Sequence, residues 1–180
     1  MNFQETELAG VVVIELESYV DERGVFTRTF DAELFDAQGL NPRVTQCSNS
    51  FNPRAGTLRG MHYQLEPYAE CKLVRCTRGS VYDVVIDLRR DSPTHGRWLG
   101  LELSAHNMLC ALVPEGCAHG FQTLEDDSEV LYQITPAYVP DAQGGVRWDD
   151  PAFAIQWPPA PNGDGRLISA RDRAFPDYEP

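Results

Sequence analysis

The stretch Ser80-Val-Tyr-Asp-Val-Val-Ile-Asp87 alternates apolar and polar residues over much of its length. This two-residue period is typical of a β-strand with one buried face. Other short β-rich runs lie on both sides of it, and with it the predicted strands cover residues 10–17, 27–30, 44–50, 73–76, 80–88, 98–103, 108–113, 120–123, 130–135 and 146–148. The pattern therefore favours an all-β protein.

Turn residues separate these runs at short intervals, at 53–56, 78–79, 93–96, 105–107, 114–116, 125–127 and 140–145. One short helix is expected near residues 31–38, with Asp31 as its N-cap and Gly39 as its stop. The tail from Asp149 is loop-like and rich in proline, but its Trp, Phe and Ile residues predict that it packs back onto the strands. The sequence thus predicts one domain over residues 1–180, a β-sandwich or jelly roll with a polar mouth.

Composition limits the classes of partner. The formal net charge of −12 argues against nucleic acid and against an anionic membrane surface, although a local arginine cluster can still bind a phosphate-bearing small molecule. No apolar run is long enough to span a bilayer, and the N-terminus lacks the basic region of a secretory signal. Five cysteines without a CxxC pair predict reduced thiols in a cytoplasmic protein.

The segment 56–74, GTLRGMHYQLEPYAECKLV, concentrates polar groups in a region with the character of a strand pair. His62 lies between Arg59 and Lys72, and Lys72 is the only lysine in the chain. A general base flanked by cations suits an anionic substrate that must lose a proton. The simpler interpretation is a structural histidine in a protein whose Arg-to-Lys ratio reflects genome composition.

A jelly-roll mouth could bring further groups to His62. Asp172 could fix the tautomer of its imidazole, Lys72 could stabilise an oxyanion, and Tyr132 could act as an acid. A base, an oxyanion donor and an acid fit proton abstraction beside a carbonyl and reprotonation on the other face.

Two further residues, His119 and Arg59, could bind phosphate. Each candidate also has a structural alternative. Tyr132 could be a half-buried strand tyrosine, Asp172 a loop cap and Lys72 a solvated edge charge, so residue types and spacing alone leave the assignment open.

Seven sequence blocks, in one order, resemble a known family. They are DERGVF at 21–26, GTLRGMHYQ at 56–64, KLV at 72–74, DVVIDLR at 83–89 with SPT at 92–94, PEGCAHGF at 114–121, Tyr132 with Tyr138, and WDDP at 148–151. Together they resemble the dTDP-4-dehydrorhamnose 3,5-epimerases, cupin-fold epimerases of nucleotide-linked 4-keto-6-deoxy sugars. The resemblance reaches from near the N-terminus to Asp172 and implies a cupin-like double-stranded β-helix, that is, a jelly roll with short helices.

The resemblance implies a role for each matching residue. His62 is similar to the family's base, Asp172 to the aspartate paired with it, Lys72 to the lysine near the C4 keto group, and Tyr132 to the acid. The implied substrate-binding residues are Arg23, Phe26, Gln46, Arg59, His119 and Tyr138. The family also implies a homodimer that exchanges N-terminal strands, here 10–17, with Arg23 and Phe26 reaching the neighbour's site.

No cofactor is expected. Metal-binding cupins usually carry a His-x-His pair, but His62 is followed by Tyr63 and Gln64, and His95 and His106 lie in predicted turns. The sequence also has no glycine-rich dinucleotide fingerprint. Epimerisation through an enolate is redox-neutral and needs neither group.

Three positions depart from the family pattern, all on the ligand-binding side. Arg28 stands where a glutamate is common, Gln143 where a glutamate is frequent, and Ser48 ends the Gln46-Cys-Ser48 version of a Q-x-N motif. A CDP- or GDP-linked keto sugar, or inversion at only one of C3 and C5, therefore stays open. The alternatives from other classes are a non-catalytic sugar-nucleotide-binding cupin and a ketoisomerase on the same scaffold.

Overall fold

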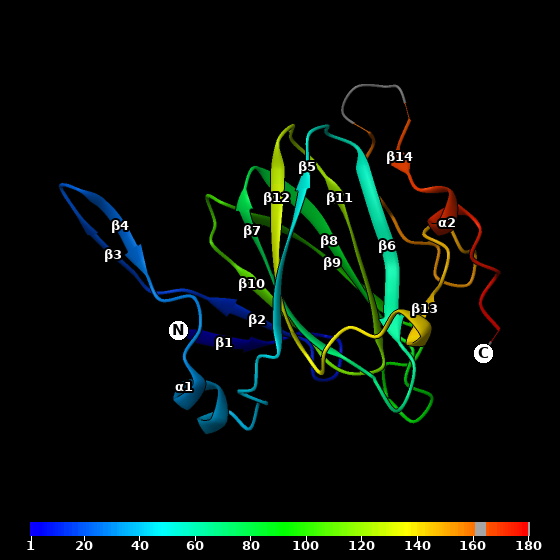
Figure 1. Cartoon of the computed structure of the whole chain (residues 1–180), viewed down its shortest axis with the longest axis horizontal. Coiled ribbons are helices and arrows are strands. Elements are labelled where there is room, and N and C mark those ends of the chain that lie inside the picture. Colours follow the sequence, from blue (N-terminus) through cyan, green and yellow to red (C-terminus); the bar gives the residue numbers. More distant parts are fainter. Residues whose placement is uncertain (161–164, 180) are drawn as a thin grey trace.

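Two antiparallel β-sheets make up most of the computed structural model, which describes residues 1–160 and 165–179 (Figure 1). The first sheet has the order β1 (Asn2–Glu5), β2 (Val12–Glu15), β10 (Cys110–Val113), β7 (Cys71–Arg78), β12 (Ser128–Thr135) and β5 (Gln46–Asn52). The second has the order β13 (Gln143–Gly145), β6 (Thr57–Gln64), β11 (Cys117–Thr123), β8 (Ser80–Asp87) and β9 (Trp98–Ser104), with β14 (Leu167–Ile168) parallel to β6. The predicted all-β jelly roll is confirmed.

The side chains of β8 alternate between two hydrophobic clusters, one on each face of the second sheet. Val81 and Val85 belong to the core cluster that also contains Val74 of β7, whereas Val84 and Ile86 belong to a second cluster on the opposite face of the strand. The strand is therefore buried on both faces, which is why its sequence is more apolar than a simple half-buried pattern.

The C-terminal tail provides the cover for that second face. Phe153, Ile155, Trp157 and Tyr178 pack with Met61 of β6 and its neighbours, as the aromatic content of the tail predicts. After this, β14 joins β6, and a short helix, α2 (Ala170–Arg173), follows it. The sequence pattern did not predict α2, whose four residues are too few to show a helical period.

The N-terminal part differs most from the prediction. The helix α1 (Ala32–Ala37) is confirmed, with Asp31 accepting hydrogen bonds from the N–H groups of Glu33 and Leu34. The predicted strand 27–30 is wrong, because only Thr27 belongs to a strand, as the last residue of β4 (Gly24–Thr27), which forms a hairpin with β3 (Ser18–Asp21). Nearer the C-terminus, the predicted strand 146–148 is also wrong. The strand there, β13, follows a 3-10 turn, η1 (Pro140–Ala142), and already ends at Gly145. In the described part of the chain, no helix could span a membrane.

A buried carboxylate fastens the N-terminal segment to the second sheet. Asp87 is fully buried, accepts hydrogen bonds from Arg89, Ser92 and Thr94, and forms an ion pair with Arg89 at 2.8 Å. Arg89 Nη2 then donates to the carbonyl of Ala9 at 2.5 Å, and the Ala9 N–H donates to Thr94 Oγ1 at 3.1 Å. Burial by itself would raise the pKa of Asp87, but these hydrogen bonds hold it well below its ordinary value.

We expect Asp87→Asn to lower the free energy of unfolding by about 2–4 kcal/mol at pH 7, because it removes the charge from several buried hydrogen bonds. The pKa of Asp87 is lower in the folded state than its ordinary value of 3.8, so its contribution is present above about pH 4 and is lost as the pH falls further. Urea unfolding at pH 7 and pH 3 measures both effects. The exposed Asp91→Asn is the control, and a difference between wild type and Asp87→Asn that grows on acidification would contradict this account.

Candidate active site

A β-bulge in β6 turns two polar side chains, those of Arg59 and His62, toward one cavity. His62 lies opposite His119 in the register with β11, and Arg59 lies opposite Phe121, so β6 has one residue more than β11 between these pairs. In a regular strand Arg59 and His62 would point to opposite faces, but here both line the same cavity of about 580 Å³. The bulge requires glycine, because a Cβ on Gly60 would come within 2.6 Å of Gly120 Cα.

The bulge also joins His62 to the C-terminal helix. His62 Nε2 lies 2.8 Å from Asp172 Oδ1, and the Gly60 N–H donates to Asp172 Oδ2 at 3.2 Å. Ser169 caps α2 by accepting a hydrogen bond from the Asp172 N–H, which fixes the Asp172 backbone. Asp172 is 5% exposed, and both of its carboxylate oxygens have a partner. Burial would raise the pKa of Asp172, but the hydrogen bonds with His62 and Gly60 lower it overall. A carboxylate that stays ionised favours the tautomer in which His62 Nδ1 is free to accept a proton.

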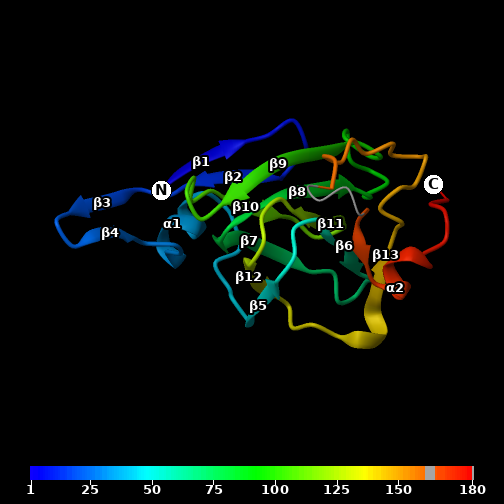
Figure 2. The ribbon, with the colours of Figure 1, turned by 90° about the horizontal axis from the view of Figure 1, so that it is seen from above.

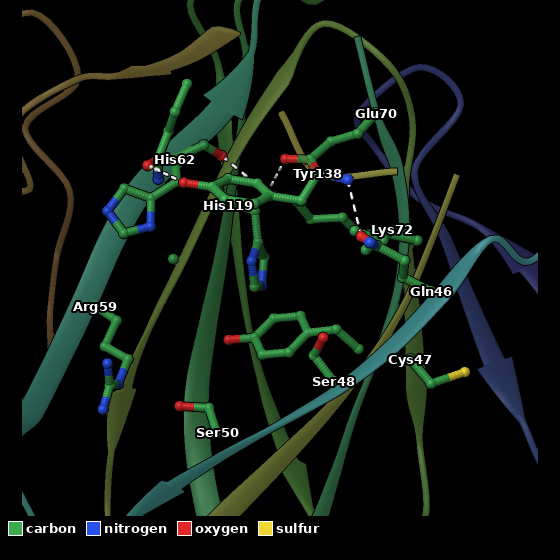
Figure 3. Close-up of a pocket in the computed structure, with 14 residues that line it drawn as sticks. Gln46, Cys47, Ser48, Ser50, Arg59, His62, Glu70, Lys72, His119 and Tyr138 are labelled. Carbon is green, nitrogen blue, oxygen red and sulfur yellow. Dashed lines mark hydrogen bonds and ion pairs between the residues drawn. The ribbon is translucent and has the colours of Figure 1, made fainter. Parts of the chain in front are cut away.

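Lys72 enters the cavity from the first sheet and carries a partner of its own. Its Nζ forms an ion pair with Glu70 Oε1 at 2.9 Å and donates to the His62 carbonyl at 3.2 Å. Both side chains of the pair are almost fully buried and line the cavity (Figure 3).

The floor of the cavity holds a second histidine–carboxylate pair. His119 Nε2 lies 2.7 Å from Asp83 Oδ1, and both residues are buried. The ring of Tyr132 on β12 packs edge-on to His119, with a centroid separation of 6.0 Å. Burial, and to a smaller extent the charge of Asp83, raises the pKa of Tyr132, so its phenol keeps its proton and is available as a donor.

The rim of the cavity combines one free cation with neutral polar groups. Arg59 Nε donates to Asn52 Oδ1 at 2.8 Å, and no carboxylate of the described residues forms an ion pair with Arg59. On another part of the rim, Tyr138 donates from its hydroxyl to Gln143 Oε1 and from its N–H to Gln46 Oε1, each at 2.8 Å. The cavity therefore offers a guanidinium for an anion and amide groups for a polar ligand.

Comparison with known proteins places this geometry in a family. A family model described as dTDP-4-dehydrorhamnose 3,5-epimerase matches residues 5–179. The chain belongs to the dTDP-4-dehydrorhamnose 3,5-epimerase family. The protein is thus an isomerase, and the resemblance seen in its sequence blocks is confirmed.

Several relatives of this epimerase family match nearly the whole chain. A dTDP-4-dehydrorhamnose 3,5-epimerase of Methanothermobacter thermautotrophicus is 44% identical over 95% of this chain and 91% of its own. The Bacillus anthracis enzyme, solved with TDP and PPi bound, superposes with a TM-score of 0.93 at 37% identity, covering 98% of this chain and 99% of that one. A Legionella pneumophila epimerase, solved with dTDP-4-keto-L-rhamnose, gives 0.90 at 34% identity, covering 99% of each chain.

The structure brings eight of the ten predicted site residues together. The cavity is lined by Gln46, Arg59, His62, Lys72, His119, Tyr132 and Tyr138, and Asp172 lies directly behind His62. Arg23 and Phe26 lie elsewhere, on the β3–β4 hairpin that projects from the barrel in both views (Figures 1 and 2). Of the departures from the family pattern, Ser48 and Gln143 line the cavity, whereas Arg28 pairs with Asp31 at 2.7 Å outside it.

Sequence reasoning missed two carboxylates of this epimerase site, Glu70 and Asp83. Each had a signal. Glu70 precedes the only lysine by two residues, which in an extended chain places both side chains on one face. Asp83 is a charged residue in the middle of a strand that is mostly apolar and buried. Among the described residues, no group of three or more His, Cys, Asp or Glu side chains is placed to hold a metal ion.

The cysteines of the epimerase differ sharply in their surroundings. Cys47 is exposed at the cavity, and its sulfur points away from the centre (Figure 3). Burial raises the pKa of Cys71 and Cys110 to about 11 and that of Cys117 to about 12, and it also raises the pKa of Cys76.

We expect iodoacetamide at pH 8 to alkylate one thiol rapidly, that of Cys47, because the thiolate is the reactive form and the other four thiols are held protonated. Peptide mass spectrometry locates the label. Cys47→Ser should abolish rapid labelling, and urea should make the remaining thiols reactive. Fast labelling of Cys71 in the folded protein would contradict the assignment.

Proposed function

We propose that the protein inverts C3, C5 or both of a nucleotide-diphospho-4-keto-6-deoxy sugar, with dTDP as the nucleotide. The ligands named for solved relatives, TDP and dTDP-4-keto-L-rhamnose, support this substrate class. The observation that carries the proposal is the meeting of the His62–Asp172 pair, Lys72 and Tyr132 at one cavity. The predicted cytoplasmic location is part of the same proposal.

The chemistry follows from these groups. A C–H bond beside a ketone is weakly acidic, so His62 can remove its proton only if the enolate oxygen is stabilised. Lys72 supplies a cation there, and such a group contributes ~3–4 kcal/mol by analogy with oxyanion-hole donors. Tyr132 then returns a proton to carbon from the other face, and an acid or base of this kind contributes about 10²–10⁴-fold. Exchange with water resets His62 and Tyr132.

The other end of the ligand is assigned to polar groups of the rim and of the floor. Arg59 and His119 would hold the diphosphate, while Gln46 and Tyr138 would contact the nucleotide-sugar. The diphosphate stays intact, so this reaction has no step that needs a metal to activate a leaving group.

We expect incubation with dTDP-4-keto-6-deoxyglucose in D₂O to place deuterium at C3, at C5 or at both, because each proton removed exchanges with solvent. NMR of the product shows which centre exchanges and which inverts. His62→Ala should abolish exchange, and Tyr132→Phe should reduce inversion more than exchange.

The exposed His106→Ala serves as the matched histidine control and should retain activity. CDP- and GDP-linked substrates tested in parallel determine the nucleotide preference. Tight calorimetric binding without exchange would replace the proposal with a binding protein, and movement of the carbonyl carbon would replace it with a ketoisomerase.

The proposal includes a homodimer in which the β3–β4 hairpin completes the neighbour's site. Tyr19, Val20, Val25 and Phe26 on this hairpin are between 53% and 74% exposed, which is unusual for four large apolar residues on one short element. The hairpin projects from the barrel (Figure 2), and none of its residues lines the chain's own cavity, so Arg23 and Phe26 can serve as ligand-binding residues only in a partner.

We expect light scattering to give twice the chain mass of 20.2 kDa. Arg23→Ala/Phe26→Ala and His62→Ala should each be nearly inactive alone, yet a refolded mixture should regain activity, because a mixed dimer has one site with every group intact. A monomeric mass, or a mixed dimer without recovered activity, would rule out this shared site.

A further inference from the structure

Glu70 is the one carboxylate that pairs with the catalytic cation, within the residues that the structure describes. Its side chain is 7% exposed and that of Lys72 is 10% exposed, and their charged atoms lie 2.9 Å apart. Two charges removed from water in this way interact strongly, and loss of either partner leaves the other uncompensated. The pair lines the cavity rather than the outer surface, so its position bears on the ligand.

The contacts of the ammonium restrict its direction. A lysine ammonium has three N–H donors, and two of those of Lys72 have acceptors in Glu70 Oε1 and the His62 carbonyl oxygen. Glu70 and His62 approach from opposite sides of the cavity (Figure 3). The third donor is left for a ligand oxygen, and the carbonyl contact sets its position relative to the His62 backbone.

The charge of the pair indicates which part of the ligand it faces. An ammonium neutralised by a carboxylate has little net attraction for a diphosphate, but its N–H dipole still stabilises charge that develops on a neutral ketone. Arg59, with only the amide oxygen of Asn52 as its partner, keeps its full charge for the diphosphate. The two cations therefore differ in role because their partners differ.

We propose that Glu70 is a positioning residue that holds the Lys72 ammonium against the substrate's keto oxygen and keeps that end of the cavity electrically neutral. The inference rests on the proposed epimerase reaction for its kinetic consequence, but the anchoring of Lys72 can be measured without any substrate. Glu70 acts through Lys72 and does not itself touch the reacting carbon.

The single lysine makes a direct measurement possible. Protein labelled with [¹⁵N]lysine contains one ammonium, and two acceptors should slow its exchange with water enough to give a visible ¹H–¹⁵N signal. In Glu70→Gln that signal should broaden or disappear. Glu115→Gln is the matched control, because Glu115 is an exposed carboxylate near Cys71 that makes no ion pair with Lys72, and it should leave the signal unchanged.

Kinetics test the consequence. We expect Glu70→Gln to lower kcat for deuterium exchange about 10–100-fold with KM changed by less than about 2-fold, since misplacement of a catalytic group by about 1 Å costs as much. In a Lys72→Gln background, Glu70→Gln should have no further effect, because Glu70 acts only through the ammonium. Thermal unfolding of every variant shows whether a loss reflects folding.

An unchanged Lys72 signal in folded Glu70→Gln would overturn the inference, as would an exchange rate within about 2-fold of wild type. The inference would also be overturned if Glu70→Gln lowered the exchange rate by the same factor in wild type and in the Lys72→Gln background. If wild type catalyses no exchange, the proposed reaction fails, while the lysine signal still decides whether Glu70 anchors the ammonium.

Discussion

The close approach of β6 to β11 at Gly60 and Gly120 is the constraint on which the site depends. With no side chain at either position, the two backbones meet, and β6 takes up an extra residue. The extra residue reverses the alternation of side chains along β6, so the side chains of Arg59 and His62 face the same cavity. It also directs the Gly60 N–H toward Asp172, and this hydrogen bond ties helix α2 to β6. A single backbone contact thus determines both the direction of His62 and its pairing with Asp172.

Carboxylates organise the polar interior of this acidic protein. His62, His119 and Lys72 each face a buried acidic partner, namely Asp172, Asp83 and Glu70 respectively. Each pairing keeps a basic group in one orientation, and Glu70 also offsets the charge of Lys72. Arg59 lacks such a partner among the described residues, so a net attraction for an anion is concentrated at one end of the cavity. A chain with formal net charge −12 can bind a diphosphate in this way.

The elements that carry chemistry and those that contact the rest of the ligand are built differently. The candidate catalytic residues His62, Lys72 and Tyr132 lie in the long strands β6, β7 and β12 of the two packed sheets. Arg28 lies just beyond a projecting hairpin, and Gln143 lies in a short edge strand after a turn. Such peripheral segments tolerate substitution because few core contacts depend on them. This explains how the sequence can depart from the family pattern at Arg28 and Gln143 while the His62, Lys72 and Tyr132 environment stays complete.

The sequence by itself determined the β-rich class, the helix capped by Asp31 and, through ordered motifs, the family and most of the residues of the candidate site. Alternation, turn residues and motifs are local signals, so they can be recognised from residues that are neighbours in the sequence. It did not show that Arg59 and His62 point the same way, that Asp83 and Glu70 complete the site, or that the hairpin leaves the barrel. These depend on a bulge and on pairing between strands far apart in the chain, and such contacts exist only once the two sheets have packed against each other.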